Sequence, residues 1–236
     1  FDLGLSSFQL FDMSRGFSFK SKQRIDMNMG LSAISAEKVL NNCEETSLKL
    51  IIKVLGEEQE ASKIVKNIIR ARKIKKITRV SELVEIIEKS KKKNYSKKIN
   101  VCTKTFQALR IFVNKETTEL IEGIIQATKL VKSGGKIIII SFHSIEDKII
   151  KFYFKNYSEN KANPSRYFPE ERIIKPIFFE SYKNNFLTPS KEELIQNPPS
   201  RSAKLRFAIR NESNFTEAEE LKIKFKHYLD LEGINV

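Results

Sequence analysis

Residues 133–150 read SGGKIIIISFHSIEDKII. The two glycines end a helical pattern, and the run Ile137–Ile140 predicts a short strand of the kind that is buried on both faces of a parallel sheet. Ser144 and Asp147 are three residues apart, which is typical of a capping box at the start of a helix. The stretch therefore predicts a strand followed directly by a helix.

The residues before this stretch complete an α/β unit. Apolar residues recur at helical spacing in 106–113 and again in 120–130, so two helices are expected before the strand. Ser141 and His143 then lie at the carboxyl end of the strand, where open α/β sheets bind ligands. We therefore expect an α/β fold with a polar site at that edge.

The composition limits the function classes. The chain has 236 residues, 40% of them hydrophobic, which is enough for a globular core. It has two cysteines without a C-x-x-C pair and two histidines, so neither a zinc framework nor a disulfide framework is expected, and the metal prediction is none. No apolar run approaches the roughly 20 residues of a membrane span, so a soluble cytoplasmic protein is expected.

The charge points to a polyanionic partner. The 43 Lys and Arg against 29 Asp and Glu give a net charge of +14. A lysine-biased genome explains the same excess equally well. Residues 35–100 carry 17 of the cations and 9 of the acids and show three helical patterns. The run Lys89–Lys98 near their end is either a solvated loop or a contact for an RNA backbone.

The carboxyl-terminal third is expected to contain a strand and a helix. KLRFAIR, residues 204–210, alternates in a way that predicts an antiparallel strand with Leu205, Phe207 and Ile209 inward and Lys204, Arg206 and Arg210 outward. Residues after Asn211 predict one amphipathic helix. Asn197-Pro198-Pro199-Ser200 is interpreted as the stop of a preceding helix.

Seven strings together resemble one family. They are DLGLSSFQL (2–10), RGFSF (15–19), DMNM (26–29), TFQALRIFVN (105–114), SGGKIIIISFHSIEDKIIK (133–151), LTPSKEE (187–193) and RSAKLRFAIR (201–210). In this order the chain resembles the ribosomal RNA cytosine-N4 methyltransferases of the RsmH (MraW) type. Members use S-adenosyl-L-methionine to methylate N4 of a cytidine in the decoding region of 16S ribosomal RNA in the small subunit.

The resemblance implies a class I, Rossmann-like methyltransferase core with an inserted helical domain. Residues 1–34 would hold the end of core strand 4 and the following site loop, and 35–102 the inserted substrate-recognition domain. Residues 103–210 would hold the rest of the core, and 211–236 a helical tail. Three strands and a Gly-rich turn are expected upstream of Phe1, so the core is expected to be N-terminally truncated. Alone it is expected neither to bind the cofactor tightly nor to methylate.

By the same resemblance, Asp2 and Gln9 occupy positions that contact the cofactor. Methylation of an exocyclic amine needs alignment and acceptors for the amine hydrogens, but neither a metal nor a covalent intermediate. Asp26, Ser141 and His143 are the candidates for that role. Ser6 and Ser7 beside Asp2 either contribute to the site or only hold a tight loop.

RNA contact is expected from cations and from an aromatic ring that stacks on a splayed base. The candidates are Arg15, Phe17, Arg110, Arg201 and Lys204. Phe8 either stacks on the base or belongs to the core. Arg110 faces either the cleft or only solvent.

Two other functions compete with this hypothesis. One is a non-catalytic RNA-binding protein of ribosome assembly. The other is a DNA amino-methyltransferase, whose D/N/S-P-P-Y/F motif Asn197-Pro198-Pro199-Ser200 begins without the aromatic residue. The sequence gives no information on the oligomeric state.

Overall fold

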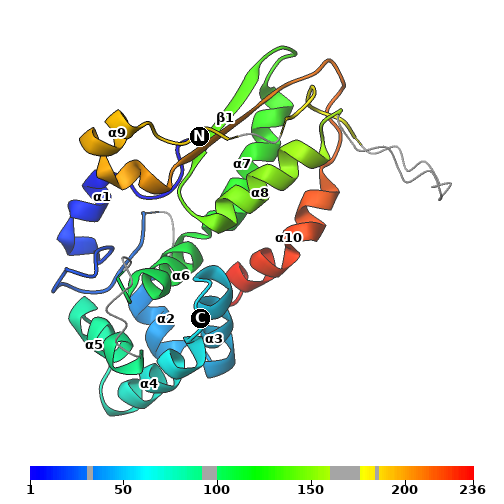
Figure 1. The fold of residues 1–236 in the computed structure, drawn as a ribbon. Helices are drawn as coiled ribbons and strands as arrows, with labels where there is room; N and C mark the ends of the chain where they lie inside the picture. Colours follow the sequence, from blue (N-terminus) through cyan, green and yellow to red (C-terminus); the bar gives the residue numbers. More distant parts are fainter. Residues whose placement is uncertain (31–33, 92–99, 160–175, 184–185) are drawn as a thin grey trace. The chain divides into compact units, whose positions relative to one another are not determined.

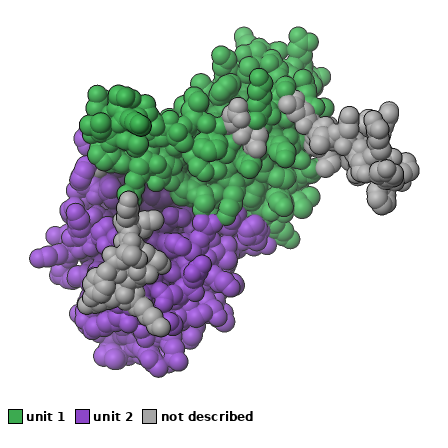
Figure 2. Space-filling view, in the orientation of Figure 1, with its two compact units in different colours: residues 1–4, 119–226 green, residues 5–118, 227–236 purple. Residues whose placement is uncertain are grey.

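The computed structural model describes residues 1–30, 34–91, 100–159, 176–183 and 186–236. The chain forms two compact units (Figure 2): unit 1 is residues 1–4 and 119–226, and unit 2 is residues 5–118 and 227–236. In chain order the elements are α1 (Ser7–Phe11), the 3-10 helix η1 (Met13–Arg15), α2 (Ala36–Asn42), α3 (Glu45–Leu55), α4 (Ala61–Ile74), α5 (Val80–Ser90), α6 (Thr103–Asn114), α7 (Glu116–Leu130), β1 (Lys136–Ser141), α8 (Ser144–Asn156), α9 (Lys191–Gln196), the 3-10 helix η2 (Pro198–Ser202), β2 (Lys204–Ile209) and α10 (Glu219–Glu232).

Unit 2 is built around the helices α2 to α6. In Figure 1, α3 lies beside α4 and α6, and it packs against both. Its apolar residues Leu48, Ile51, Ile52 and Leu55 are fully buried, because the i, i+3, i+4, i+7 spacing places them on one face. α4 packs in turn on α5. The three helical patterns predicted within residues 35–100 are thus confirmed as α3, α4 and α5.

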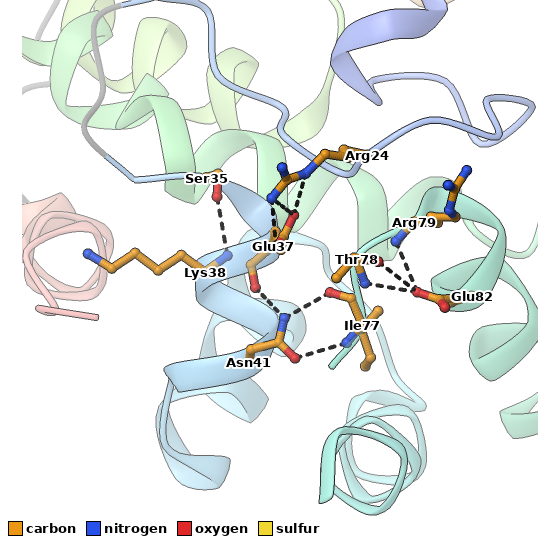
Figure 3. Close-up of polar contacts among 9 residues, drawn as sticks. All are labelled: Arg24, Ser35, Glu37, Lys38, Asn41, Ile77, Thr78, Arg79 and Glu82. Carbon is orange, nitrogen blue, oxygen red and sulfur yellow. Dashed lines mark hydrogen bonds and ion pairs between the residues drawn. The ribbon is translucent and has the colours of Figure 1, made fainter. Parts of the chain in front are cut away.

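Side chains of α2 hold both the loop before α2 and the loop before α5 (Figure 3). Asn41 donates to the carbonyl of Ile77 at 2.8 Å, and its Oδ1 accepts from the Ile77 amide at 3.0 Å. Arg24 pairs with Glu37 at 3.0 Å. The two bonds of Asn41 satisfy the backbone N–H and C=O of Ile77, which no helix or strand would otherwise pair.

Unit 1 contains a small sheet. β1 and β2 are antiparallel, with Ile138 opposite Phe207 and Ser141 opposite Lys204. On the other side of β1, Asp2 forms a parallel bridge with Ile140. The described residues contain only these two strands and isolated bridges, so a complete Rossmann-like sheet is not among them.

The two faces of this sheet differ from the expected pattern. Ile139 and Arg206 lie opposite each other and are buried, whereas Ile138 and Phe207 are each 46% exposed. The prediction that both faces of β1 are buried is therefore wrong for these residues. The prediction that Phe207 points inward and Arg206 outward is also wrong, because α8 packs on the other face and supplies the partner of Arg206.

Arg210 is buried for a similar reason. Its guanidinium donates to backbone carbonyls of Thr128 at 3.1 Å and Phe178 at 2.9 Å, and it also donates to Asn211 and Ser213. Carbonyl groups thus accept the hydrogen bonds of Arg210, although the alternation of apolar and polar residues predicted that this side chain faces solvent.

The start of α8 lies one residue before the predicted capping box. His143 is the N-cap residue, with extended backbone, and Glu146 accepts from the amide of Phe142 at 2.9 Å. Ser144 and Asp147 are therefore not the capping pair, and Asp147 is available for a different contact.

The tail helix is confirmed with one change. α10 carries buried Leu221, Phe225 and Tyr228 on one face, but the backbone is not helical at Phe225. In unit 2, Glu232 near its end accepts from the amides of Thr117 at 3.0 Å and Thr118 at 2.9 Å. A carboxylate from the tail thus satisfies two of the unpaired N–H groups at the start of α7.

Candidate functional site

The carboxyl edge of the sheet in unit 1 gathers three of the predicted residues. The amide of Leu3 donates to Ile140 at 3.1 Å, and the amide of Ile140 donates to Phe1 at 2.9 Å. Residues 1–3 therefore run parallel to β1 and end at the same edge. Asp2 is exposed there, and it pairs with Ile140, the residue that precedes Ser141.

Gly4 turns the chain away from this edge. Its φ is +87°, in the left-handed region that favours glycine. Asp2 consequently lies two residues before a bend, at the end of the paired segment. This is the position at which α/β sheets present ligand-binding groups.

His143 is held at the same edge. Its Nε2 lies 3.1 Å from Oε1 of Glu146, and both ring nitrogens are buried without a hydrogen bond of good geometry among the residues that the structure describes. If Nε2 carries the hydrogen toward Glu146, Nδ1 keeps its lone pair and is an acceptor. Ser141 donates to the carbonyl of Lys204 at 3.4 Å.

A cluster of charged groups includes Lys204, the residue that pairs with Ser141. Asp147 of α8 accepts from Arg206 at 2.8 Å and from Lys204 at 3.1 Å. Arg206 also donates to the hydroxyl of Tyr182 at 2.9 Å, and Phe186 lies under both cations, at 5.1 Å from Lys204 and 5.0 Å from Arg206. The cluster holds the end of β2 against α8.

The pKa values follow from this packing. Burial would raise the pKa of Asp147, but the hydrogen bonds from Arg206 and Lys204 outweigh burial and hold the pKa below its ordinary value of 3.8. Burial raises the pKa of the Tyr182 hydroxyl, against the bond from Arg206. Asp147 is therefore ionised and Tyr182 neutral at neutral pH.

Hydrogen bonds in unit 2 join three of the segments that carry the family resemblance: RGFSF (15–19), DMNM (26–29) and TFQALRIFVN (105–114). Asn114 at the end of α6 donates to the carbonyl of Met27 at 2.8 Å and accepts from the amide of Met29 at 2.8 Å. The amide of Met27 donates to the carbonyl of Arg15 at 2.8 Å. Three separate segments of the sequence thus hold the backbone around Met27.

Met27 has a left-handed backbone, with φ of +59°, although it is not a glycine. Its side chain is fully buried. Such a conformation persists only where the surroundings hold it, and it occurs often at ligand-binding sites. Asp26, next to it, has a half-buried side chain, so this loop presents a carboxylate from a fixed backbone.

The aromatic residues of this region divide into buried and exposed. Phe17 is 5% exposed, with the guanidinium of Arg15 5.4 Å from its ring centre. Phe8 on α1 is 90% exposed, so the alternative that Phe8 belongs to the core is wrong within the described chain. Gln9 caps α1 by accepting from the amide of Ser6 at 3.0 Å.

The remaining predicted residues lie in different surroundings. Arg110 forms two hydrogen bonds to Glu116, at 2.8 and 2.9 Å, and is mostly buried. Arg201 is exposed on η2.

The basic run Lys89–Lys98 is described only in part, since residues 92–98 lie outside the described residues. Lys89 pairs with Glu85, and Lys91 pairs with Glu58. α9 ends at Gln196 before Asn197, as the double proline predicted.

Sequence reasoning missed Glu146, Tyr182, Phe186 and Asn114. Glu146 follows His143 by three residues, so the capping spacing was a usable signal. Asn114 ends the string TFQALRIFVN, but its partners are 85 and 87 residues away. Nothing in a single sequence indicates such partners.

Comparison with known proteins identifies the class. A profile of the MraW methylase family matches residues 1–211. Since this match covers most of the chain, the chain belongs to the MraW methylase family.

Individual relatives are consistent with membership of this family. The ribosomal RNA small subunit methyltransferase H of Bartonella bacilliformis is 38% identical over 232 residues, which are 98% of this chain and 70% of the relative. The protein of the same name from Ehrlichia chaffeensis is 42% identical over 214 residues, 89% of this chain and 68% of the relative. That of Bartonella henselae is 39% identical, with 61% of the relative covered. The chain thus spans about two thirds of the length of these relatives.

Among the described residues, none of the helices combines the length and the apolar character that a bilayer crossing needs.

Proposed function

We propose that this chain is part of an S-adenosyl-L-methionine-dependent methyltransferase that modifies N4 of a cytidine in the decoding region of small-subunit ribosomal RNA. The observation that supports the proposal is the parallel pairing of residues 1–3 with β1, in which Asp2 pairs with Ile140, the residue before Ser141 at the carboxyl end of the strand. Membership of the MraW methylase family supports the same reaction class.

The edge in unit 1 suits a polar cofactor. Asp2 offers an exposed carboxylate that accepts hydrogen bonds from hydroxyl or ammonium groups. When bound, the cofactor supplies a methyl group on a positively charged sulfur. Asp2 would hold and orient the cofactor from the end of its strand, and Gln9 is proposed as a second contact. The polar loop after β1 would border the same site.

The nucleophile of this reaction is weak, because the lone pair of a cytosine amine is delocalised into the ring. Acceptors for the amine hydrogens help the lone pair to become available. Nδ1 of His143, whose ring is oriented by Glu146, and the Ser141 hydroxyl are proposed acceptors in unit 1. The Asp26 carboxylate is a third candidate, presented by the loop that Asn114 holds.

RNA contact is proposed for Arg15, Phe17, Arg110, Arg201 and Lys204. The five side chains differ in their present partners. Arg201 is exposed, whereas Arg110 is bonded to Glu116 and Lys204 to Asp147, so the latter two would have to exchange these partners for phosphate. We therefore place Arg201 first among the five.

The test uses labelled S-adenosyl-L-methionine and small ribosomal subunits that lack the modification. The 236-residue chain is assayed beside the product of the same reading frame with any coding sequence upstream of Phe1. N4-methylcytidine in the RNA is the expected product of the longer protein. Asp2→Asn should abolish the labelling. Asp230→Asn, which changes an exposed carboxylate on α10, should leave it unchanged.

Three results would contradict the proposal in different ways. RNA binding without any labelling would favour the non-catalytic assembly protein. Labelling of duplex DNA in place of ribosomal subunits would favour the DNA enzyme. Full labelling by the Asp2→Asn variant would keep the reaction but remove Asp2 from the cofactor site. For the 236-residue chain alone, weak or undetectable cofactor binding in calorimetry is the expected result.

A further inference from the structure

Helix α4 carries cations along its exposed face. Lys63, Lys66, Arg70 and Lys73 follow one another at spacings of three, four and three residues, and all four are exposed. Residues three and four apart lie on the same side of a helix, so the four side chains form one line, which we call the α4 stripe. Ala61, Ile64, Val65 and Ile68 on the opposite face are buried in unit 2.

Carboxylates do not neutralise most of this stripe. α4 contains no acidic residue in its 14 positions. Lys63 pairs with Glu60 at 3.4 Å, at the amino end of the helix. Lys66, Arg70 and Lys73 form no ion pair or hydrogen bond with other described residues. Three adjacent cations therefore face solvent without a partner in the described part of the chain.

A general excess of lysine does not account for the stripe. The neighbouring helices of the same unit mix both signs of charge on their exposed faces: α5 carries Glu85 and Glu88 beside Lys89, and Lys89 pairs with Glu85. α3 carries Glu45 with its lysines. Compositional bias acts on all helices alike, so it does not explain why the exposed face of α4 differs from those of α3 and α5.

The stability of the helix does not account for it either. Like charges three or four residues apart destabilise a helix, by about 0.2–0.5 kcal/mol per pair. Cations are favoured near the carboxyl end, which suits Lys73, but Lys63 lies in the first turn, where the helix dipole disfavours it. The fold uses a fifth cation, Arg72, differently, since it donates to the carbonyls of Leu40 and Cys43.

From this pattern we infer that the α4 stripe binds the phosphate backbone of RNA, through Lys66, Arg70 and Lys73. The inference rests on the proposed function, which makes ribosomal RNA the substrate. The three positions span about 10 Å along the helix at about 1.5 Å per residue. Each of the three cations neutralises about one phosphate, so the stripe suits about three phosphates. Such contacts position the RNA and carry no sequence preference.

The experiment measures the salt dependence of binding. A labelled RNA hairpin is titrated with the 236-residue chain over a series of KCl concentrations. Against the parent, the triple variant Lys66→Ala/Arg70→Ala/Lys73→Ala should reduce the slope of log K against log salt by about 2 to 3. Its affinity at moderate salt should fall at least about tenfold. Circular dichroism checks that the variant keeps its helices.

Two controls make the result specific. Lys129→Ala/Lys132→Ala/Lys136→Ala removes the same charge from exposed positions of unit 1 near the amino end of β1, away from the candidate edge of that unit. It should leave the slope nearly unchanged. The variant Lys66→Arg/Arg70→Lys/Lys73→Arg keeps every charge and should bind like the parent.

An unchanged slope in the Ala variant would overturn the inference, as would an equal loss in the unit 1 control. If polyglutamate displaced the hairpin as well as unlabelled RNA does, the stripe would be a site for an acidic protein, and the RNA assignment would be wrong. The methylation assay distinguishes the failure of this inference from the failure of the proposed function. A smaller salt slope in the Ala variant without methyl transfer by the parent would support RNA binding by the stripe but contradict the methyltransferase. Methyl transfer by the parent with an unchanged slope in the Ala variant would contradict only the role of the stripe.

Discussion

Asn114 shows how one side chain fixes a candidate site. The amide group has one acceptor and two donor hydrogens, and here it uses them on Met29, Met27 and Arg110. The left-handed backbone of Met27 costs about 1–3 kcal/mol in a residue other than glycine, and these bonds offset that cost. Gly16 in the same loop has φ of +74° and lies so close to Arg24 that a Cβ would be 2.6 Å from its carbonyl oxygen.

Asn114→Ala should lower the free energy of unfolding by about 2–3 kcal/mol, because it leaves buried backbone groups without partners. Urea unfolding measures this loss. Asn67→Ala removes an amide that makes a single bond, to Ser90, and should cost about 1 kcal/mol. Equal losses in the two variants would show that the loop does not depend on Asn114.

Asp147→Asn should destabilise the protein by about 2–3 kcal/mol at neutral pH, because it leaves the buried guanidinium of Arg206 without its counter-charge. The pKa of Asp147 is held below 3.8, so its contribution is complete above pH 3.8 and is lost as the pH falls through the lowered pKa. The difference between the parent and the variant should therefore shrink below pH 3.8 in unfolding curves.

The control is Glu180→Gln, which changes an exposed carboxylate of unit 1 and should have a small effect at every pH. A stability gap that stayed constant from neutral to acidic pH would rule out the ion pair as the cause.

Among the elements, α5 depends on its first turn. Glu82 accepts from the amides of Thr78 at 2.8 Å and Arg79 at 3.0 Å (Figure 3). It also pairs with Lys75 at 2.8 Å, and this bond, more than any other contact, lowers the pKa of Glu82 to about 2, against the opposing effect of burial. The same carboxylate therefore caps the start of α5 and holds the loop before this helix.

Glu82→Gln should cost about 1 kcal/mol at neutral pH, as loss of a helix cap does. The pKa is lowered from 4.5, so the contribution of Glu82 is complete above pH 4.5 and disappears as the pH falls toward 2. Thermal unfolding over that range measures it. Glu85→Gln, on the exposed face of α5, should cost less than about 0.5 kcal/mol. The role of Glu82 is refuted if both variants behave alike.

β1 allows a direct test of which face is covered. Ile139 is fully buried and Ile138 is 46% exposed, although they are neighbours of the same type. Ile139→Thr should cost about 2 kcal/mol or more, because it removes apolar volume and buries a hydroxyl. Ile138→Thr should stay within about 0.5 kcal/mol of the parent. Chemical denaturation distinguishes the two, and equally large losses in both variants would restore the original prediction that both faces of this strand are buried.

At the scale of the molecule, the tail contributes to unit 2. The family match ends at residue 211, but Glu232 lies in the core of unit 2, 2% exposed, and bonds to the first turn of α7. Burial raises the pKa of Glu232, while its hydrogen bonds to Thr117 and Thr118 oppose the shift. The tail is thus a structural part of this unit.

Glu232→Ala should lower the free energy of unfolding by about 2–3 kcal/mol, since two amides and a hydroxyl lose their acceptor. The amides of Thr117 and Thr118 should also exchange hydrogen faster, because the start of α7 opens more often. Asp230→Ala, on the exposed side of α10, should change neither quantity. Unchanged exchange at Thr117 in the Glu232 variant would show that the tail does not hold α7.

The sequence by itself determined the elements and the family. Helical spacing located α3 to α5, the isoleucine run located β1, and the start of the chain was predicted to be extended, which its pairing with β1 bears out. These signals are local: they depend on which side chains lie within one helical turn or one strand. The family resemblance came from long strings and needed no structure.

Only the tertiary structure decided the faces and the partners. Alternation in residues 204–210 gave the correct strand but the wrong inner face, because Asp147 and Tyr182 satisfy Arg206, and carbonyl groups satisfy Arg210. Asn114 and Glu232 act on residues 85 to 115 positions away. Burial of a polar group depends on whether a distant segment supplies its hydrogen bonds, and a single sequence does not contain that information.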